Sequence, residues 1–277
     1  MAVSKLYNLN RPERAALIET ENANIEDFIK ASYPVWLAAT KGQANPRTLY
    51  DEARKLIEPY KDKFSGVLTA KELGAVTTHE KGDSGAYVAA LLNETKIEKL
   101  SLGQPGFYCQ DPAVFLKPGK AVELLEDAEI SFSLGLYAEG GTIINNARRA
   151  PPFDFVNYIG AEGRSCIMVN RGSVSFMGHQ CTGCTAINLL DAGQMGKKAR
   201  DSVFVSRQKQ DQDHVLSGIK SPCWYVGPKE LEGDGNLDGF VSEIEKASIE
   251  SDVPKVNEAA HKIDAHVRRN YNPRKVA

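Results

Sequence analysis

The feature that most constrains the fold is a change of hydrophobic pattern along the chain. Residues 11–100 carry apolar side chains at helical spacing, and the same spacing returns from about residue 240. Between residues 103 and 227 the apolar residues instead form short or alternating runs, which glycine and proline interrupt. Many short strands between turn signals are typical of a sandwich or a bent sheet. We therefore expect an α+β protein whose central β-sandwich or bent mixed sheet is flanked by N-terminal and C-terminal helices.

The pattern also divides the chain into two parts. Helical spacing begins at Pro46 and again at Ser84, two residue types that favour helix starts. Within the centre, residues 170–173 (Asn-Arg-Gly-Ser) predict a tight hairpin between two strands. We find no internal repeat. The sequence therefore predicts a helical N-terminal module over residues 1–102 and a β-rich domain with C-terminal helices over residues 103–277.

Composition limits the expected partners and compartment. The net charge is −2, with 34 basic and 36 acidic side chains, which gives no electrostatic case for binding nucleic acid. The longest apolar run, residues 86–92, is far shorter than the ~20 residues that cross a bilayer, so we expect no membrane span. Five cysteines, an odd number, and no N-terminal signal stretch indicate free thiols in a reducing compartment. We expect a cytoplasmic protein, or one delivered into a host cell without a classical signal peptide.

A calcium-loop pattern lies at residues 234–245. Asp-Gly-Asn-Leu-Asp-Gly opens the segment and puts glycine at the sixth position, where an EF-hand loop turns sharply. Calcium prefers oxygen ligands, which carboxylates, an amide, a backbone carbonyl and a serine-held water would supply. The expected ligands are Asp234, Asn236, Asp238, Phe240, Ser242 and Glu245. The calcium would be structural, and the alternative interpretation is a polar linker that caps a helix.

Residues 178–185 are the segment richest in reactive side chains. Cys181 and Cys184 have Cys-x-x-Cys spacing, and with His179 they would form part of a zinc site. A redox dithiol normally leads straight into a helix, whereas the sequence predicts a strand after Cys184. The non-functional alternative is that both cysteines are small residues of the hydrophobic core.

A third hypothesis for this segment is a nucleophilic thiol. Cys184 follows a turn and would be activated by His214, because a neighbouring imidazole lowers the pKa of a thiol. The backbone N–H groups of Thr182 and Gly183 would form the oxyanion hole. His179 is the fallback base.

The sequence Thr182-Gly183-Cys184-Thr185, followed by an apolar strand and a histidine, resembles the catalytic patch of bacterial glutamine deamidases of the cytotoxic necrotizing factor type. That family has serine where this chain has Thr182, and a shorter gap to the histidine. The resemblance implies a β-sandwich core with flanking helices, Cys184 as the nucleophile and His214 as the general base.

The same resemblance implies a reaction and a partner. The Cys184 thiolate would attack the side-chain amide of a glutamine in a protein substrate such as a host small GTPase. The histidine would protonate the departing ammonia, and water would hydrolyse the thioester. The second functional class that fits the sequence is a non-enzymatic assembly or interaction protein, either capsid-like or a scaffold.

Overall fold

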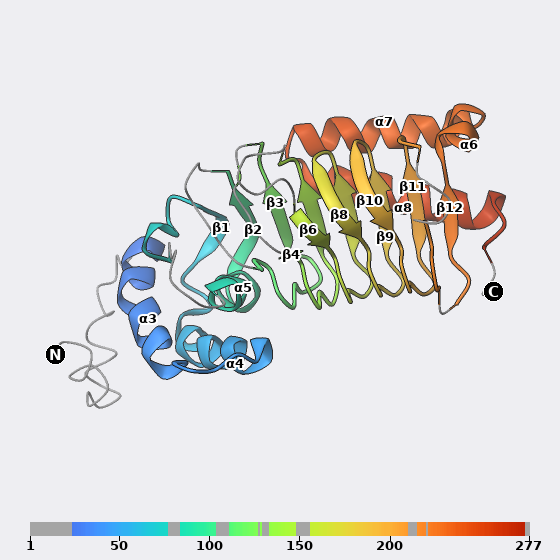
Figure 1. Cartoon of the computed structure of the whole chain (residues 1–277). Coiled ribbons are helices and arrows are strands. Elements are labelled where there is room, and N and C mark those ends of the chain that lie inside the picture. The colour runs from blue at the N-terminus through green and yellow to red at the C-terminus, as the bar shows by residue number, and fades with distance from the viewer. Residues whose placement is uncertain are drawn as a thin grey trace.

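The computed structural model describes residues 24–76, 84–103, 111–126, 128, 133–147, 156–209, 215–219 and 221–274. Its centre is a parallel β-solenoid of about five turns, with helices at one end and along one side (Figure 1). The expected β-sandwich or bent mixed sheet is therefore wrong. All ten strand pairings in the two sheets are parallel, so consecutive strands cannot be joined by hairpins and the chain must coil instead.

The coils build two sheets, because each complete coil gives one strand to each. The larger sheet contains, in spatial order, β1 (Ser65–Thr69), β2 (Lys96–Leu102), β3 (Ala121–Leu124), β5 (Thr142–Asn145), β7 (Ile167–Asn170), β9 (Thr185–Asn188), β11 (Val203–Ser206) and β12 (Trp224–Val226). The smaller sheet contains β10 (Asp191–Met195), β8 (Ser173–Met177), β6 (Val156–Ile159) and β4 (Ser133–Leu134). Residues 170–173, expected to form a hairpin, instead turn a corner from one sheet to the other.

An 18-residue repeat builds the best-matched coils. β7, β9 and β11 begin at residues 167, 185 and 203, and their residues pair in register. Equivalent positions carry the same or similar residues, as in the sets Gly160, Gly178, Gly196 and Cys166, Cys184, Ser202. The expectation of no internal repeat is wrong. The strands of the flanking coils begin at Thr142 and Trp224, which do not fit the 18-residue spacing. The repeat is therefore not apparent when the whole β-rich segment is searched for one period.

Glycine is required at the corner where each coil leaves the smaller sheet. Gly178 and Gly196 have φ of 67° and 65°, a region that side-chain-bearing residues rarely adopt. A Cβ atom at Gly178 would lie 2.8 Å from the ring of Phe204, and one at Gly196 would lie 2.5 Å from Leu216. The glycine period thus marks corners where a side chain would collide with the interior of the solenoid.

Both faces of the central strands are buried. Inside the solenoid, side chains such as Met168, Cys184 and Phe204 join a core that continues into the N-terminal helices. On the outer face, side chains such as Val169 and Ile187 form a second core with the C-terminal helices. This two-sided burial explains why these strands are almost continuously apolar in sequence.

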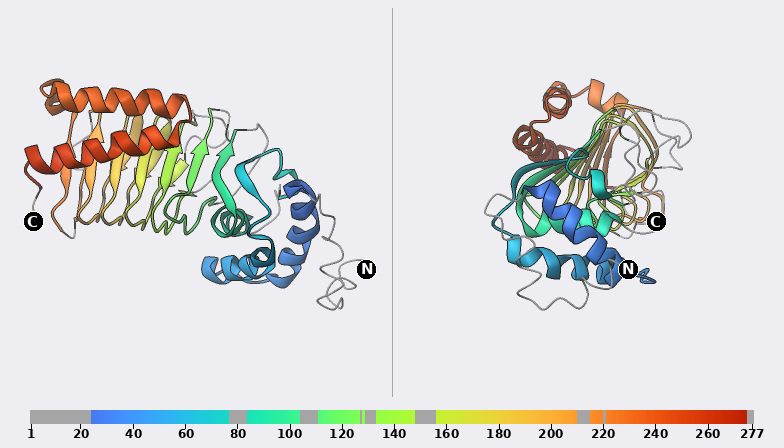
Figure 2. Two further views of the ribbon diagram at one scale, coloured as in Figure 1. Left: turned by 180° about the vertical axis from the view of Figure 1, so that it is seen from behind. Right: turned by 90° about the vertical axis from the view of Figure 1, so that its left-hand side faces the viewer.

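Helices cover one end and one side of the solenoid. The N-terminal end carries α3 (Ile25–Ala39), α4 (Pro46–Ile57), the 3-10 turns η1 (Glu58–Tyr60) and η2 (Gly74–Val76), and α5 (Ser84–Glu94). The C-terminal part forms α6 (Pro228–Glu232) and the antiparallel pair α7 (Gly235–Ile249) and α8 (Val253–Asn270), which lies along the outer face of the larger sheet (Figure 2).

The expected helix starts at Pro46 and Ser84 are confirmed. The expected N-terminal module also supplies strands, because β1 and β2 extend the larger sheet. None of the helices in the described ranges is both long and apolar enough to span a bilayer.

Candidate functional site

The cysteine segment forms the corner between β8 and β9, and Cys184 is sealed inside it. The Cys184 side chain is 0% exposed. Its sulfur accepts a hydrogen bond from the backbone N–H of Cys166 in the neighbouring coil, 3.3 Å away. It also lies 3.6 Å from the carbonyl oxygen of Gly163 and 3.5 Å from that of Thr182. Cys184 therefore occupies an interior stack between coils rather than an open edge of the sheet.

The environment of Cys184 favours the neutral thiol. Its hydrogen bond with the Cys166 thiol lowers the pKa of Cys184, but the contact with Cys181 and burial outweigh this, so that the pKa is raised well above its usual value. Cys166 likewise has a raised pKa, first from its hydrogen bond to Cys184 and then from burial. Because the thiolate is the reactive form, this stack disfavours nucleophilic chemistry.

The N–H groups expected to form an oxyanion hole already have partners. Thr182 N–H donates to the carbonyl of Gly163 at 2.9 Å, and Gly183 N–H donates to that of Arg200 at 3.0 Å. The N–H of Cys184 donates to the hydroxyl of Ser202 at 3.0 Å. These bonds join one coil to the next, so none of the three groups points to a substrate.

Of the two histidines expected to act as the base, the structure describes only His179. His214 lies outside the described residues. His179 is half-buried, with its ring edge-on to Tyr158 at 5.9 Å and to Phe176 at 6.0 Å. Burial lowers the pKa of His179, and nearby lysines lower it further. Among the hydrogen bonds of the described residues, none joins His179 to Cys184.

The zinc hypothesis finds no ligand cluster in the described part of the chain. There, no group of three or more histidine, cysteine, aspartate or glutamate side chains is arranged to hold a metal ion. Cys181 is buried, and its sulfur lies 3.5 Å from the Ser202 hydroxyl. The expected set Cys181, Cys184 and His179 therefore does not fit a zinc ion.

The expected EF-hand loop is wrong in conformation. An EF-hand loop wraps around its ion, whereas residues 235–249 form the helix α7. Asp234 is the N-cap of that helix and accepts a hydrogen bond from the Leu237 N–H at 3.1 Å. Its other carboxylate oxygen lies 2.6 Å from His266 Nε2 and accepts a hydrogen bond from the Tyr271 hydroxyl at 3.0 Å. The cap interpretation of this segment is the one that fits.

Of the remaining expected calcium ligands, three bind one arginine, one is exposed and one packs against the second core. Arg207, just after β11, binds Glu245 at 2.5 Å, Asp238 at 3.2 Å and the Ser242 hydroxyl at 2.8 Å. Asn236 is exposed and Phe240 is half-buried against the second core. The spacing that resembles a calcium loop thus places three side chains on one face of α7, where they anchor the helix to the solenoid.

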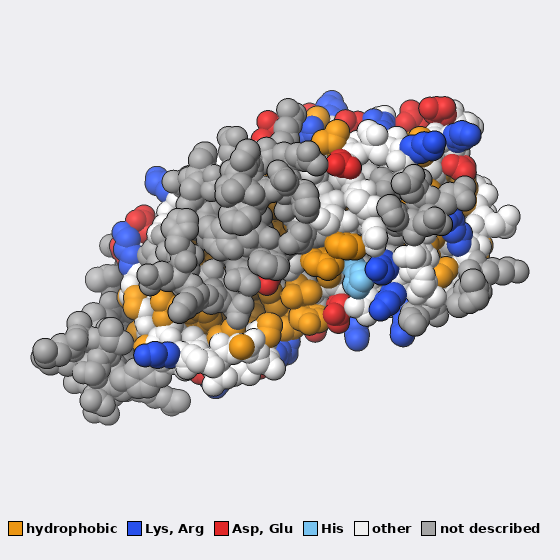
Figure 3. Space-filling model, viewed as in Figure 1, with side chains coloured by type: hydrophobic (Ala, Val, Ile, Leu, Met, Phe, Trp, Pro, Cys, Tyr) orange, Lys and Arg blue, Asp and Glu red, His pale blue; other side chains and the backbone are white. Residues whose placement is uncertain are grey.

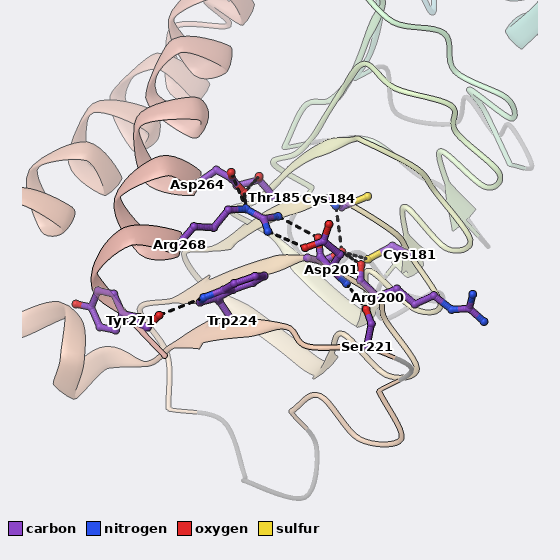
Figure 4. A network of polar contacts seen from close by, with 11 residues as sticks. Cys181, Cys184, Thr185, Arg200, Asp201, Ser221, Trp224, Asp264, Arg268 and Tyr271 are labelled. Carbon is purple, nitrogen blue, oxygen red and sulfur yellow. Dashed lines mark hydrogen bonds and ion pairs between the residues drawn. The ribbon is translucent and has the colours of Figure 1, made fainter. Parts of the chain in front are cut away.

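A second polar network, which the sequence did not reveal, fixes α8 to the last coils (Figure 4). Arg268 bonds Asp264 within α8 at 2.9 Å and Asp201 on the solenoid corner at 2.7 Å. Its guanidinium also lies 4.4 Å from the ring centre of Trp224. Asp264 in turn accepts a hydrogen bond from the Thr185 hydroxyl at 3.1 Å. The spacing of Asp264 and Arg268 signals the helical pair, but nothing local signals Asp201 or Trp224.

The solvent-facing side of the same corner is basic. Arg164 and Arg200 flank Thr182 in register across three coils, and Lys197 and Lys198 lie beside Arg200 in the chain. Arg164, Lys198 and Arg200 are exposed, and Lys197 is half-buried. We call these four residues the basic corner. The sequence reading missed them because they are separated by up to 36 positions and meet only through the coil stacking.

No family model, no curated protein and no solved structure matches the chain.

Proposed function

We propose that the protein is a non-enzymatic interaction scaffold, whose solenoid presents rows of side chains to a macromolecular partner. The observation that carries the proposal is in-register stacking. Arg164, Thr182 and Arg200 pair directly across neighbouring coils, and neighbouring parallel strands lie ~4.8 Å apart. Repeat proteins use such straight, extended surfaces for binding, because equivalent side chains from successive repeats act together.

The helices support this role by making the rows rigid. α7 and α8 bury the outer face of the larger sheet, and Arg207 and Arg268 join the two helices to the solenoid. A surface that is held fixed before binding loses less conformational entropy when a partner docks.

The glutamine deamidase hypothesis stays a prediction, and the environment of Cys184 counts against it. A deamidase needs a thiolate that reaches the amide carbon of its substrate. Here the thiol is sealed between coils, its pKa is raised, and the neighbouring N–H groups are bonded to other coils.

One experiment separates the two classes. Wild type and Cys184→Ser are each expressed in the cells that produce the protein, and native complexes are sized by gel filtration with light scattering. We expect both chains to elute in the same complex, above the 30.3 kDa mass of one chain. Intact-mass analysis of small GTPases incubated with the wild type should show no conversion of amide to acid.

Two results would overturn the proposed function. One is amide conversion that disappears with Cys184→Ser, which would make the protein an enzyme. The other is a chain that elutes as a lone monomer under every condition, which would leave it without a partner to bind.

Calcium binding at residues 234–245 also stays a prediction. Because Arg207 already pairs with Asp238 and Glu245, and Asp234 already accepts hydrogen bonds from the Leu237 N–H and the Tyr271 hydroxyl, we expect the melting temperature to be the same in calcium and in chelator. A calcium-dependent rise that Asp234→Asn abolishes would show that the helix start binds the ion.

A further inference from the structure

The basic corner is distinguished by four cations that form no ion pair within the described part of the chain. None of Arg164, Lys197, Lys198 and Arg200 forms a salt bridge with a described acidic residue. Asp201, which follows Arg200 directly, is engaged by Arg268. Glu139 and Glu162 are the other acidic residues beside these corners; both are exposed, and neither forms a salt bridge with a described residue of the basic corner.

The C-terminal helices show the opposite arrangement. Residues 228–270 contain ten acidic and six basic side chains, whereas residues 160–200 contain two acidic and five basic ones. Yet the acidic side chains of α7 and α8 are paired within the molecule, as Asp238 and Glu245 are with Arg207 and Glu243 is with Lys262. Within the described ranges, the acidic side chains of α7 and α8 are thus neutralised inside the molecule, whereas four basic side chains lie together at the basic corner and can meet an anionic partner.

We propose that the basic corner binds an acidic segment of a partner protein, an inference that rests on the scaffold function proposed above. Guanidinium groups bind carboxylates through paired N–H donors, and the exposed Arg164 and Arg200 pair with Thr182 from the coils on either side of it. Two coil steps separate the backbones of these arginines by roughly 10 Å, about the length of three residues of an extended chain. A short extended peptide can therefore place acidic side chains opposite both.

A protein segment fits this surface better than a nucleic acid does. The chain as a whole has a net charge of −2, and a long polyanion extending past the corner would meet the acidic excess of residues 228–270. The cationic area covers three coils, which matches a short segment rather than a continuous backbone.

Aromatic side chains beside the corner give the partner an apolar contact. Tyr158 of β6 and Phe176 of β8 stack with their ring centres 4.8 Å apart, and both contact His179 next to the corner. Figure 3 shows hydrophobic and basic side chains meeting on the face that carries the smaller sheet. We expect the preferred segment to combine acidic residues with an aromatic or aliphatic one.

The test uses a fluorescent glutamate-rich peptide of about ten residues containing one phenylalanine, long enough to span three coils. Its binding to the full chain is followed by anisotropy at about 50 mM and about 200 mM salt. The variant is Arg164→Glu with Arg200→Glu. The matched control is Lys229→Glu with Arg269→Glu, because both residues are exposed, lie on the C-terminal helices and give the same change of net charge.

We expect the corner variant to lose at least about tenfold in peptide affinity, because two attractive contacts become repulsive. The control should lose less than about twofold, and added salt should weaken the wild-type complex. An oligonucleotide of equal charge should bind more weakly than the peptide.

Three outcomes would overturn the proposal: equal losses in both variants, tighter binding of the oligonucleotide, or wild-type affinity no better than that of the corner variant. Both variants should melt within a few degrees of the wild type, which shows that the comparison is between folded proteins. If native complexes persist while the corner variant keeps full peptide affinity, the scaffold function stands and only this inference fails.

Discussion

Replacing Asn170 by alanine should cost the solenoid more stability than any single surface change. Asn170 is 0% exposed and ends β7 at the corner between the two sheets. Its side-chain oxygen accepts from Asn145 Nδ2 at 2.8 Å, and its side-chain nitrogen donates to Asn188 Oδ1 at 2.8 Å and to the carbonyl of Asp191 at 2.8 Å. The ladder continues from Asn188 to the Ser206 hydroxyl at 3.1 Å. Asn170 therefore joins three coils at once.

The expected loss follows from the groups that alanine leaves behind. Asn145 Nδ2 and Asn188 Oδ1 would each lose a buried partner, and each unsatisfied group costs roughly 1–3 kcal/mol. Adding the bond to the Asp191 carbonyl, we expect the free energy of unfolding to fall by about 3–5 kcal/mol. Asn188→Ala removes fewer bonds and should cost less, about 2 kcal/mol.

Urea unfolding followed by circular dichroism measures these losses. Asn236→Ala is the matched control, because Asn236 is exposed on α7, and its unfolding free energy should change by less than about 0.7 kcal/mol. A loss below about 1 kcal/mol for Asn170→Ala, or one no larger than for Asn236→Ala, would refute the role given to the asparagine ladder.

Three further predictions concern the C-terminal clamp, the corner histidine and the thiols. Arg268→Ala should lower the unfolding free energy by about 1–2 kcal/mol through loss of its ion pairs and ring contact, whereas exposed Arg269→Ala should change it little in the same urea assay. Burial lowers the pKa of His179 in the folded state, so the folded protein favours the neutral imidazole. The stability of the fold is therefore unaffected by this histidine above the unfolded pKa of about 6.5, and it falls as the pH drops from that value towards the folded pKa. His179→Gln should therefore flatten the fall of stability between about pH 7 and pH 5, and an unchanged slope would contradict this. Cys184 should resist alkylation in the native protein and react fully in denaturant, as read by peptide mass spectrometry, whereas fast native labelling would show that it is accessible.

Residue patterns in the sequence predict many of the helices and strands, but they predict the wrong arrangement of those strands. Among the short apolar runs that predict strands, Ile143-Ile144 and Val203-Phe204-Val205 lie in β5 and β11. Their unbroken apolar character is typical of parallel strands buried on both faces, whereas an antiparallel sandwich alternates. The pairing partners lie a full coil away, so no turn signal between them reveals the direction of the chain.

The residue patterns behind the site predictions also have a structural use. Cys166 and Ser202 occupy the positions equivalent to Cys184 in the neighbouring coils, 18 residues away on either side. Small residues repeated at this spacing are typical of a stack inside a solenoid rather than of a catalytic position. The acidic pattern after Asp234 serves equally as a helix cap and an arginine-binding face. Arg207, which takes up those acidic side chains, lies far away in sequence, so only the fold brings it to α7.

The position of the covering helices at the C-terminal end of the chain matters during synthesis. All the coils leave the ribosome before residues 228–270, which form the cover of the larger sheet. Until that last stretch emerges, the side of the nascent solenoid carrying Val169, Ile187 and Val205 faces water. A truncated chain that ends near residue 227 would leave this apolar face permanently exposed to water. We expect such a chain to bind chaperones or to be degraded rather than to form a shorter functional solenoid.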